Sequence, residues 1–229
     1  MTHVREHRSI LAGAEKRLLI HIAAHLPAAV TSDHLTTLAL VAMLTAGAAF
    51  ATIQATAWGA GLFVMALAVN WFGDSLDGTV ARVRDQQRPR YGYYVDHVVD
   101  LAGTTALVAG MAASSLMSPA IAIALLAAYC LVSAESYLAT HSLGVFRISF
   151  AGVGPTELRI LLAVGAVFVA RDPWVTVAGR HMLLFDFGGI IATGGLFFAF
   201  VASSVRNTRA LYLADPLPRA LEHEKERAA

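Results

Sequence analysis

Six apolar segments limit what this chain can fold into, because each approaches the length needed to cross a bilayer. A transmembrane helix takes about 20 predominantly apolar residues. Of the 229 residues, 57% belong to the hydrophobic set and only 14% are charged, whereas soluble domains are about 25% charged. The sequence therefore predicts an all-α integral membrane protein with six transmembrane helices, at Leu35–Ile53, Trp58–Phe72, Val95–Ala113, Ala120–Leu138, Leu158–Ala170 and Phe185–Val205.

The second, third and fifth segments are short unless their helices continue through polar ends. Such an extension would carry charged side chains to membrane depth, where ionisable residues are costly and usually functional. The second segment runs into Gly-Asp-Ser-Leu-Asp-Gly-Thr-Val-Ala-Arg at residues 73–82, and the third begins beside Asp96 and Asp100. We therefore expect the functional site at these polar ends.

The first thirty residues are expected to form a helix on the membrane surface. Glu15, Lys16 and Arg17 interrupt the only apolar core that a signal peptide could use. Apolar residues recur at helical spacing, which is typical of an amphipathic interfacial helix; they are Ile10, Leu11, Ala14, Leu18 and Ile22. We predict a single membrane domain over residues 1–229, made of a surface helix and lead-in (1–30), a six-helix core (31–206) and a cytoplasmic tail (207–229).

Lysine and arginine gather in alternate loops, and short loops rich in these residues stay on the cytoplasmic side. The N-terminal segment, the loop between the second and third spans and the C-terminal tail are basic, whereas the opposite loops hold only Arg171 and Arg180. Both termini and the active site are therefore expected to be cytoplasmic, in the inner membrane if the protein is bacterial. The chain has one cysteine, so no intrachain disulfide is expected. Nucleic acid is not an expected partner.

Two pairs of aspartates occupy matched positions on consecutive spans. Residues three, four or seven apart lie on the same side of a helix. Two helices joined by a basic loop would thus present a box of carboxylate oxygens, and glycines at 78 and 92 would let a ligand approach the backbone. One face carries Asp74, Asp77 and Ala81, and the other carries Gly92, Asp96 and Asp100.

Four ionised carboxylates need compensating charge, because burying an uncompensated ion is costly. Divalent cations supply it, and Mg²⁺ commonly bridges carboxylates and substrate phosphates. Two ions, Mg²⁺ or Mn²⁺, would clamp a diphosphate. The alternatives are helix capping, as expected for Asp33 before the first span, and an ion path through the membrane. An ion path needs acids spread across the bilayer, yet these four cluster at the cytoplasmic end, and Asp186 alone, expected to cap the last span, lies near the opposite side.

Eight positions in this region resemble the signature of the CDP-alcohol phosphotransferases (CDP-alcohol phosphatidyltransferases), integral membrane enzymes of phospholipid synthesis. The pattern is Asp-x2-Asp-Gly-x2-Ala-Arg followed by Gly-x3-Asp-x3-Asp, over residues 74–100. The six-span layout extends the resemblance over nearly the whole chain. Nine residues separate Arg82 from Gly92, one more than is usual in the family, and the extra residue is expected in a loop.

The resemblance implies that a hydroxyl of a lipid or alcohol acceptor attacks the β-phosphorus of a CDP-alcohol donor and that CMP leaves. In the family the four aspartates hold two divalent ions on the diphosphate, and Asp100 occupies the position usually assigned as general base. Homodimers are common among its members. The implied metal ligands are Asp74, Asp77, Asp96 and Asp100, and the implied nucleotide site is Gly78, Ala81, Arg82 and Gly92.

Two features resemble the choline/ethanolamine phosphotransferase branch, which transfers a phospho-head group from a CDP-amino alcohol to diacylglycerol. His97 follows Asp96, and Gly-Pro-Thr-Glu at 154–157 begins the fifth span. The alternative branch passes a phosphatidyl group from CDP-diacylglycerol to a small polar alcohol. Its inositol-phosphate members tend to carry a basic segment at the fourth span, where this chain has Ser-Ala-Glu-Ser-Tyr at 133–137.

Several side chains have both a functional and a structural interpretation. Glu135 suits a cationic head group, and it also suits a structural pair with Arg159 or Arg147. We predict that His97 and Glu157 together deprotonate the acceptor hydroxyl, because imidazole titrates near neutral pH and an acid can stabilise its cation. The structural alternatives are a hydrogen bond from His97 to Asp96, and a favourable interaction of the Glu157 carboxylate with the N-terminus of its helix.

Arg82, rather than the loop residues Arg88 or Arg90, is expected to contact the donor.

Overall fold

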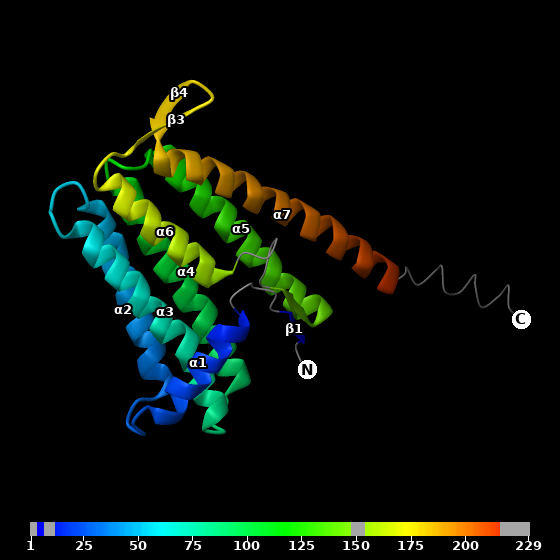
Figure 1. Cartoon of the computed structure of the whole chain (residues 1–229). Coiled ribbons are helices and arrows are strands. Elements are labelled where there is room, and N and C mark those ends of the chain that lie inside the picture. Colours follow the sequence, from blue (N-terminus) through cyan, green and yellow to red (C-terminus); the bar gives the residue numbers. More distant parts are fainter. Residues whose placement is uncertain (1–3, 7–11, 148–153, 216–229) are drawn as a thin grey trace, which may run out of the picture.

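The computed structural model describes residues 4–6, 12–147 and 154–215, which form seven helices and two small two-stranded sheets (Figure 1). The helices are α1 (Ala12–His25), α2 (Ser32–Ala51), α3 (Gly59–Val83), α4 (Pro89–Ala113), α5 (Pro119–Leu143), α6 (Pro155–Val169) and α7 (Leu184–Ala214). Strand β1 (Val4–Glu6) pairs in parallel with β2 (Val145–Arg147), and β3 (Trp174–Val177) pairs antiparallel with β4 (Arg180–Leu183).

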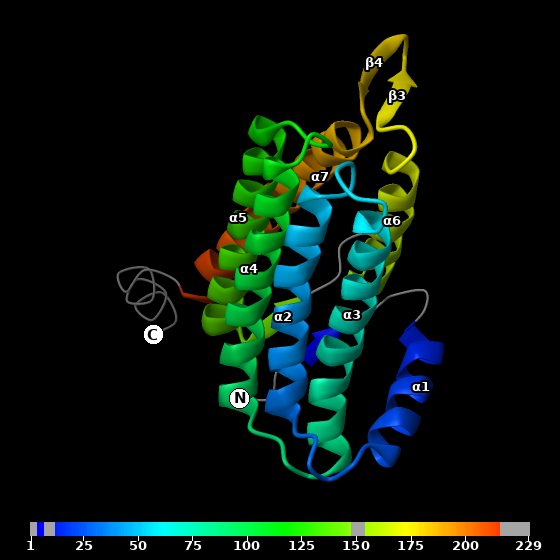
Figure 2. The ribbon, with the colours of Figure 1, turned by 90° about the vertical axis from the view of Figure 1, so that its left-hand side faces the viewer.

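Helix α2 lies between α3 and α4 and packs closely against both (Figure 2). Small residues allow this approach: a Cβ added at Gly73 would lie 2.6 Å from the Leu35 carbonyl oxygen, and one at Gly110 would overlap the Gly47 carbonyl. Helix α2 therefore supports both helices that carry the aspartates.

The main apolar core is centred on Phe50 of α2. Its ring meets Phe63 of α3 and Phe185 of α7 edge to face, with centroids 5.2 and 4.7 Å apart, which is a favourable aromatic geometry. Because Phe50 is near the end of α2 and Phe63 near the start of α3, this core fills the end of the bundle away from Asp74. A second cluster joins α1 to α2 and α3 through Leu19, Ala23, Leu35, Leu76 and Val80.

Four helices in the described part of the chain, α2, α3, α5 and α7, are long and apolar enough to cross a membrane. Helix α3 has 25 residues and continues through its polar end to Val83, as the short second segment predicted. Helix α4 also has 25 residues but carries Arg90, Asp96, His97 and Asp100 in its first half. Helix α6 has 15 residues, or about 22 Å, against a hydrocarbon core of about 30 Å. The helical membrane architecture is confirmed, and the count of six spans stays a prediction.

The β3–β4 hairpin before α7 is a feature that the sequence analysis did not predict. Its two-residue turn consists of Ala178 and Gly179, with φ of 49° and 76°, as in the primed turns that suit hairpins. The signal was the run of aromatic and β-branched residues Trp-Val-Thr-Val, with a glycine two residues after it.

Helix α7 begins with Asp186 in its first turn, but Asp186 does not cap this helix as expected. Its two carboxylate oxygens accept hydrogen bonds from the backbone N and Oγ of Ser118, each at 2.6 Å, so it binds the N-terminus of α5 instead. Helix α7 ends at Ala214, so the first part of the predicted tail is helical. The rest of the tail, residues 216–229, lies outside the described residues.

Candidate active site

The four aspartates of the signature lie at one end of the bundle on two consecutive helices. Asp74 and Asp77 are in the second half of α3, Asp96 and Asp100 are in the first half of α4, and only residues 84–88 connect the two helices. Asp100 is within electrostatic range of the other three and of Arg159. The structure thus brings the four carboxylates into one electrostatic environment.

Asp77 is buried and is held by α2 as well as by its own helix. Its Oδ2 accepts a hydrogen bond from Thr36 Oγ1 at 2.7 Å, and its Oδ1 accepts one from the Gly78 backbone N at 2.5 Å. Ser32 Oγ donates to the Asp77 carbonyl oxygen at 2.9 Å. Sequence reasoning missed Ser32 and Thr36, although their four-residue spacing places two hydroxyls on one face of α2.

Asp74 is half-buried and forms an ion pair with α6. Arg159 donates from Nη2 to Asp74 Oδ2 at 2.5 Å and from Nε to Asn70 Oδ1 at 2.8 Å. Asn70 is itself buried and donates from Nδ2 to the Ala39 carbonyl oxygen at 3.0 Å. Asn70 was not predicted as a site residue, although it precedes Asp74 by four positions and so shares its helical face.

Arg159 therefore does not pair with Glu135, which the sequence analysis left as one alternative. Glu135 Oε1 accepts a hydrogen bond from Asn207 Nδ2 of α7 at 2.6 Å. This contact links α5 to α7. The side chain of Arg147, the other pairing partner considered, lies outside the described side chains.

Asp96 and Asp100 are exposed, and His97 lies between them in the chain. His97 Nδ1 is 2.6 Å from the Tyr93 carbonyl oxygen, and because a carbonyl only accepts, Nδ1 carries the hydrogen. The Nε2 of a neutral imidazole is then the acceptor. The ring centroid of His97 lies 4.2 Å from that of Tyr93 and 4.9 Å from that of Tyr137 on α5.

Glu157 lies in the first turn of α6, where its Oε2 accepts a hydrogen bond from the Gly154 backbone N at 3.0 Å. A carboxylate at this position also favours the positive end of the helix dipole. His97 contacts α5 through Tyr137, and Glu157 stabilises the start of α6. Their joint role in proton transfer stays a prediction.

The predicted nucleotide positions lie on the last turns of α3 and the first turn of α4. Arg82 Nη2 donates to Thr79 Oγ1 at 3.0 Å, and a Cβ at Gly78 would be 3.3 Å from Arg82 Nη1. Gly78 thus leaves room for the guanidinium group to fold back along its own helix. Ala81 is half-buried, and a Cβ at Gly92 would have nothing within 4 Å, so the described residues leave space beside Gly92.

The loop between α3 and α4 lies inside the nine-residue stretch between Arg82 and Gly92, and its Asp85 has a φ of 53°. Arg84 Nη1 donates to the Val30 carbonyl oxygen at 2.7 Å. Arg88 binds both carboxylate oxygens of Asp33 at 2.6 Å, and this hydrogen bonding raises the pKa of the Arg88 guanidinium above its ordinary value.

Asp33 was expected to cap α2, but Thr31 is the capping residue, since its side chain accepts a hydrogen bond from the His34 backbone N.

The carboxylates fit divalent cations by their chemistry, since Mg²⁺ prefers oxygen ligands. In the described residues, however, no three His, Cys, Asp or Glu side chains gather closely enough to hold one ion. Both α3 carboxylates already have partners, Asp74 in Arg159 and Asp77 in Thr36 and Gly78. The donor set therefore suits a divalent ion by its chemistry, and the described geometry gives both α3 carboxylates protein partners.

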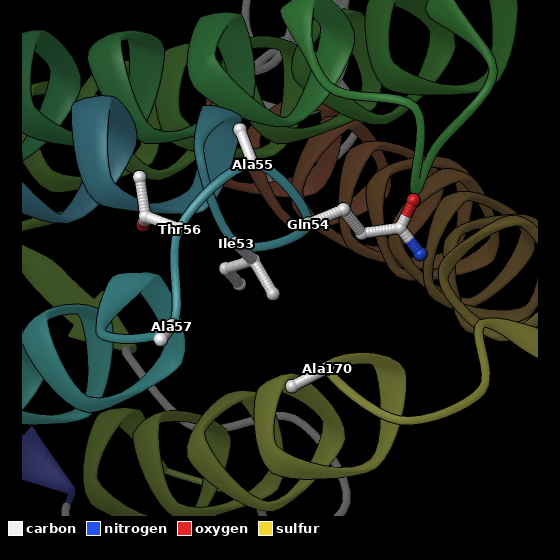
Figure 3. Close-up of a pocket in the computed structure, with 6 residues that line it drawn as sticks. All are labelled: Ile53, Gln54, Ala55, Thr56, Ala57 and Ala170. Carbon is white, nitrogen blue, oxygen red and sulfur yellow. The ribbon is translucent and has the colours of Figure 1, made fainter.

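One hollow of about 390 Å³ lies at the other end of the bundle, where the α2–α3 loop faces the end of α6 (Figure 3). It is lined by Ile53, Gln54, Ala55, Thr56, Ala57 and Ala170. None of these side chains is titratable, so the hollow offers no acid or base for phosphoryl transfer.

A family model described as CDP-alcohol phosphatidyltransferase matches residues 29–209, well over half of the chain and all of the aspartate signature. Comparison with curated proteins finds no match. The family consists of transferases of substituted phosphate groups that serve phospholipid synthesis and generally use divalent metal ions. Since the match, the signature and the helical membrane architecture agree, this chain belongs to the CDP-alcohol phosphatidyltransferase family.

Proposed function

We propose that this enzyme transfers a phospho-amino-alcohol group from a CDP-amino alcohol to diacylglycerol and releases CMP. The acceptor hydroxyl oxygen bonds to the β-phosphorus, whose bond to the bridging oxygen of the diphosphate breaks. CMP leaves with that oxygen, and the hydroxyl proton passes to a base. Family membership favours this transferase chemistry over an ion-transport function.

The observation that carries the choice of head group is an aromatic cluster between α4 and α5, formed by Tyr93, His97 and Tyr137. Tyr137 also lies within electrostatic range of Asp100. Electron-rich rings beside carboxylates attract quaternary or primary ammonium groups. Helix α5 contains no lysine or arginine that would repel such a head group or bind an acceptor phosphate.

The four aspartates, Asp74, Asp77, Asp96 and Asp100, are the proposed ligands of two divalent ions, Mg²⁺ or Mn²⁺. When bound, such ions neutralise charge on the phosphoryl oxygens and assist the leaving group. The exposure of Asp96 and Asp100 supports access by the donor.

The nucleotide end of the donor is proposed to bind along Gly78, Ala81, Arg82 and Gly92. The guanidinium of Arg82 offers charge-assisted hydrogen bonds to a diphosphate. Arg82 follows Gly78 by four residues on α3, so both lie on one face of the helix, which supports Arg82 as the donor contact.

For the proton, we propose His97 as the base, with Glu157 stabilising its cation and Asp100 serving mainly as a metal ligand. The hydrogen bond between His97 Nδ1 and the Tyr93 carbonyl supports this choice, since it leaves Nε2 as the acceptor atom.

For the membrane, we propose that all of α2 to α7 span the bilayer with both termini and the active site in the cytoplasm. Helix α1 would then lie at the interface, with Leu19 buried against the bundle and Leu18 exposed toward the lipid. A homodimer is compatible with this arrangement.

The alternative is a CDP-diacylglycerol-dependent phosphatidyltransferase acting on a small polar alcohol, favoured by the description of the matching family. The test uses detergent-purified protein with Mg²⁺ or Mn²⁺ and measures CMP release. CDP-choline and CDP-ethanolamine are offered with diacylglycerol, and CDP-diacylglycerol with serine, glycerol phosphate or inositol phosphate. Asp77→Asn protein supplies the background rate. CMP release only with CDP-diacylglycerol would exclude the proposed head-group transfer.

A further inference from the structure

Arg159 has a position in the site that the proposed reaction does not use. It comes from α6, not from the helices of the signature, and its side chain is only 16% exposed. Its guanidinium bridges Asp74 Oδ2 at 2.5 Å and Asn70 Oδ1 at 2.8 Å. Because one guanidinium donates to two neighbouring acceptors on the same face of α3, its orientation is fixed by both hydrogen bonds. An exposed surface ion pair has no such constraint and contributes little.

The position of this guanidinium is fixed from both sides. Asn70 is 5% exposed, and its amide is tied to the Ala39 carbonyl oxygen. On the other side, Glu15 Oε1 of α1 accepts hydrogen bonds from Trp71 Nε1 at 2.7 Å and from Thr156 Oγ1 at 2.8 Å. These bonds hold the first turn of α6, one turn before Arg159, against α3. The pair with Asp74 is therefore built into the fold.

The charge of Arg159 acts on more than one carboxylate, because Asp100 is also within its electrostatic range. A divalent ion ligated by Asp74 would meet a guanidinium already hydrogen-bonded to one of the two carboxylate oxygens. Like charges a few ångströms apart repel strongly where water is partly excluded. Cation binding and the Arg159–Asp74 pair therefore oppose each other.

We propose that Arg159 is an internal counter-ion that competes with divalent cations for Asp74. In the absence of metal it offsets part of the negative charge of the four aspartates. A divalent ion held by Asp74 would displace the Nη2 hydrogen bond, whereas the hydrogen bond from Nε to Asn70 would remain. Arg159 is thus a positioning residue that sets the metal affinity of the site, and this inference rests on the proposed metal site.

The test measures Mn²⁺ binding to detergent-purified protein at one pH without donor, using the electron paramagnetic resonance signal of free Mn²⁺. Arg159→Gln keeps a polar side chain and removes the charge, and it should bind Mn²⁺ about tenfold more tightly than wild type. Asp74→Asn should bind weakly, and adding Arg159→Gln to it should raise the affinity by less than Arg159→Gln does in wild type, because the direct competition acts through Asp74 and only the weaker effect on Asp100 remains. Arg88→Gln removes another arginine–aspartate pair outside the site and should leave the affinity unchanged.

A second measurement is thermal unfolding in chelator. Arg159→Gln should melt earlier than wild type, since it leaves the carboxylates less compensated, whereas the double variant with Asp74→Asn should recover part of the loss. An unchanged or weaker Mn²⁺ affinity in a folded Arg159→Gln protein would overturn the competition. Failure of wild type and Arg159→Gln alike to bind Mn²⁺ would overturn the metal site of the proposed function, and the competition with it.

Discussion

The hydroxyl of Thr36 provides a sharp test of whether Asp77 belongs to the active site. Thr36→Val is nearly isosteric and removes the 2.7 Å hydrogen bond to the buried Asp77 carboxylate. A hydrogen bond to a charged group contributes about 1.5–3 kcal/mol, and each kcal/mol shifts the melting temperature of a chain of this size by roughly 2–4 °C. If Asp77 is a metal ligand, loss of this supporting contact should also lower activity about 10–100-fold.

Thr37→Val is the matched control, because Thr37 donates to the Asp33 carbonyl oxygen at 2.8 Å from an exposed position on the same helix. It should change stability by less than about 0.5 kcal/mol and leave turnover unchanged. CMP release and thermal unfolding in the same detergent measure both effects. Wild-type activity in Thr36→Val, or equal losses in the two variants, would refute the role of Thr36 in holding a catalytic carboxylate.

Two further predictions concern the metal ligands and the donor. Activity should disappear in chelator, and Asp74→Asn, Asp77→Asn or Asp96→Asn should each lower the CMP release rate by orders of magnitude in protein that still folds; full turnover in excess EDTA would contradict this. Arg82→Ala should raise the KM for the donor or abolish turnover, whereas Arg88→Ala should have a small effect because Arg88 binds Asp33 outside the site. A more damaging Arg88→Ala would mean that the loop, and not α3, supplies the donor contact.

The positions of the aspartates could be predicted because helical periodicity acts along the chain. Spacings of three and four residues place Asp74 with Asp77 and Asp96 with Asp100, whatever surrounds the helices. The short apolar run before Asp74 also predicted that α3 continues through its polar end, because a shorter helix would not cross the bilayer.

The partners of these carboxylates could not be predicted in the same way, because they come from helices distant in the chain. Thr36 reaches Asp77 only because glycines let α2 pack closely on α3, and Arg159 reaches Asp74 only because Glu15 and Thr156 hold α6 there. Hydroxyl, carboxylate and guanidinium groups can each bind many different polar partners. Tertiary packing, which local spacing does not encode, makes the choice.

The assignment of the base can be decided by separating proton transfer from metal binding. Asp100 shares its surroundings with three other carboxylates, and a carboxylate engaged with a divalent ion is a poor base. His97 is held by the Tyr93 carbonyl with Nε2 left as acceptor, and imidazole titrates near neutral pH. We therefore expect His97→Ala and Glu157→Gln to slow pre-steady-state CMP formation at saturating donor about 10²–10⁴-fold if both act in proton transfer, with Mn²⁺ affinity close to wild type. Near-normal chemistry in both variants would return the base role to Asp100, and a loss of metal affinity in His97→Ala would instead make His97 a support for Asp96.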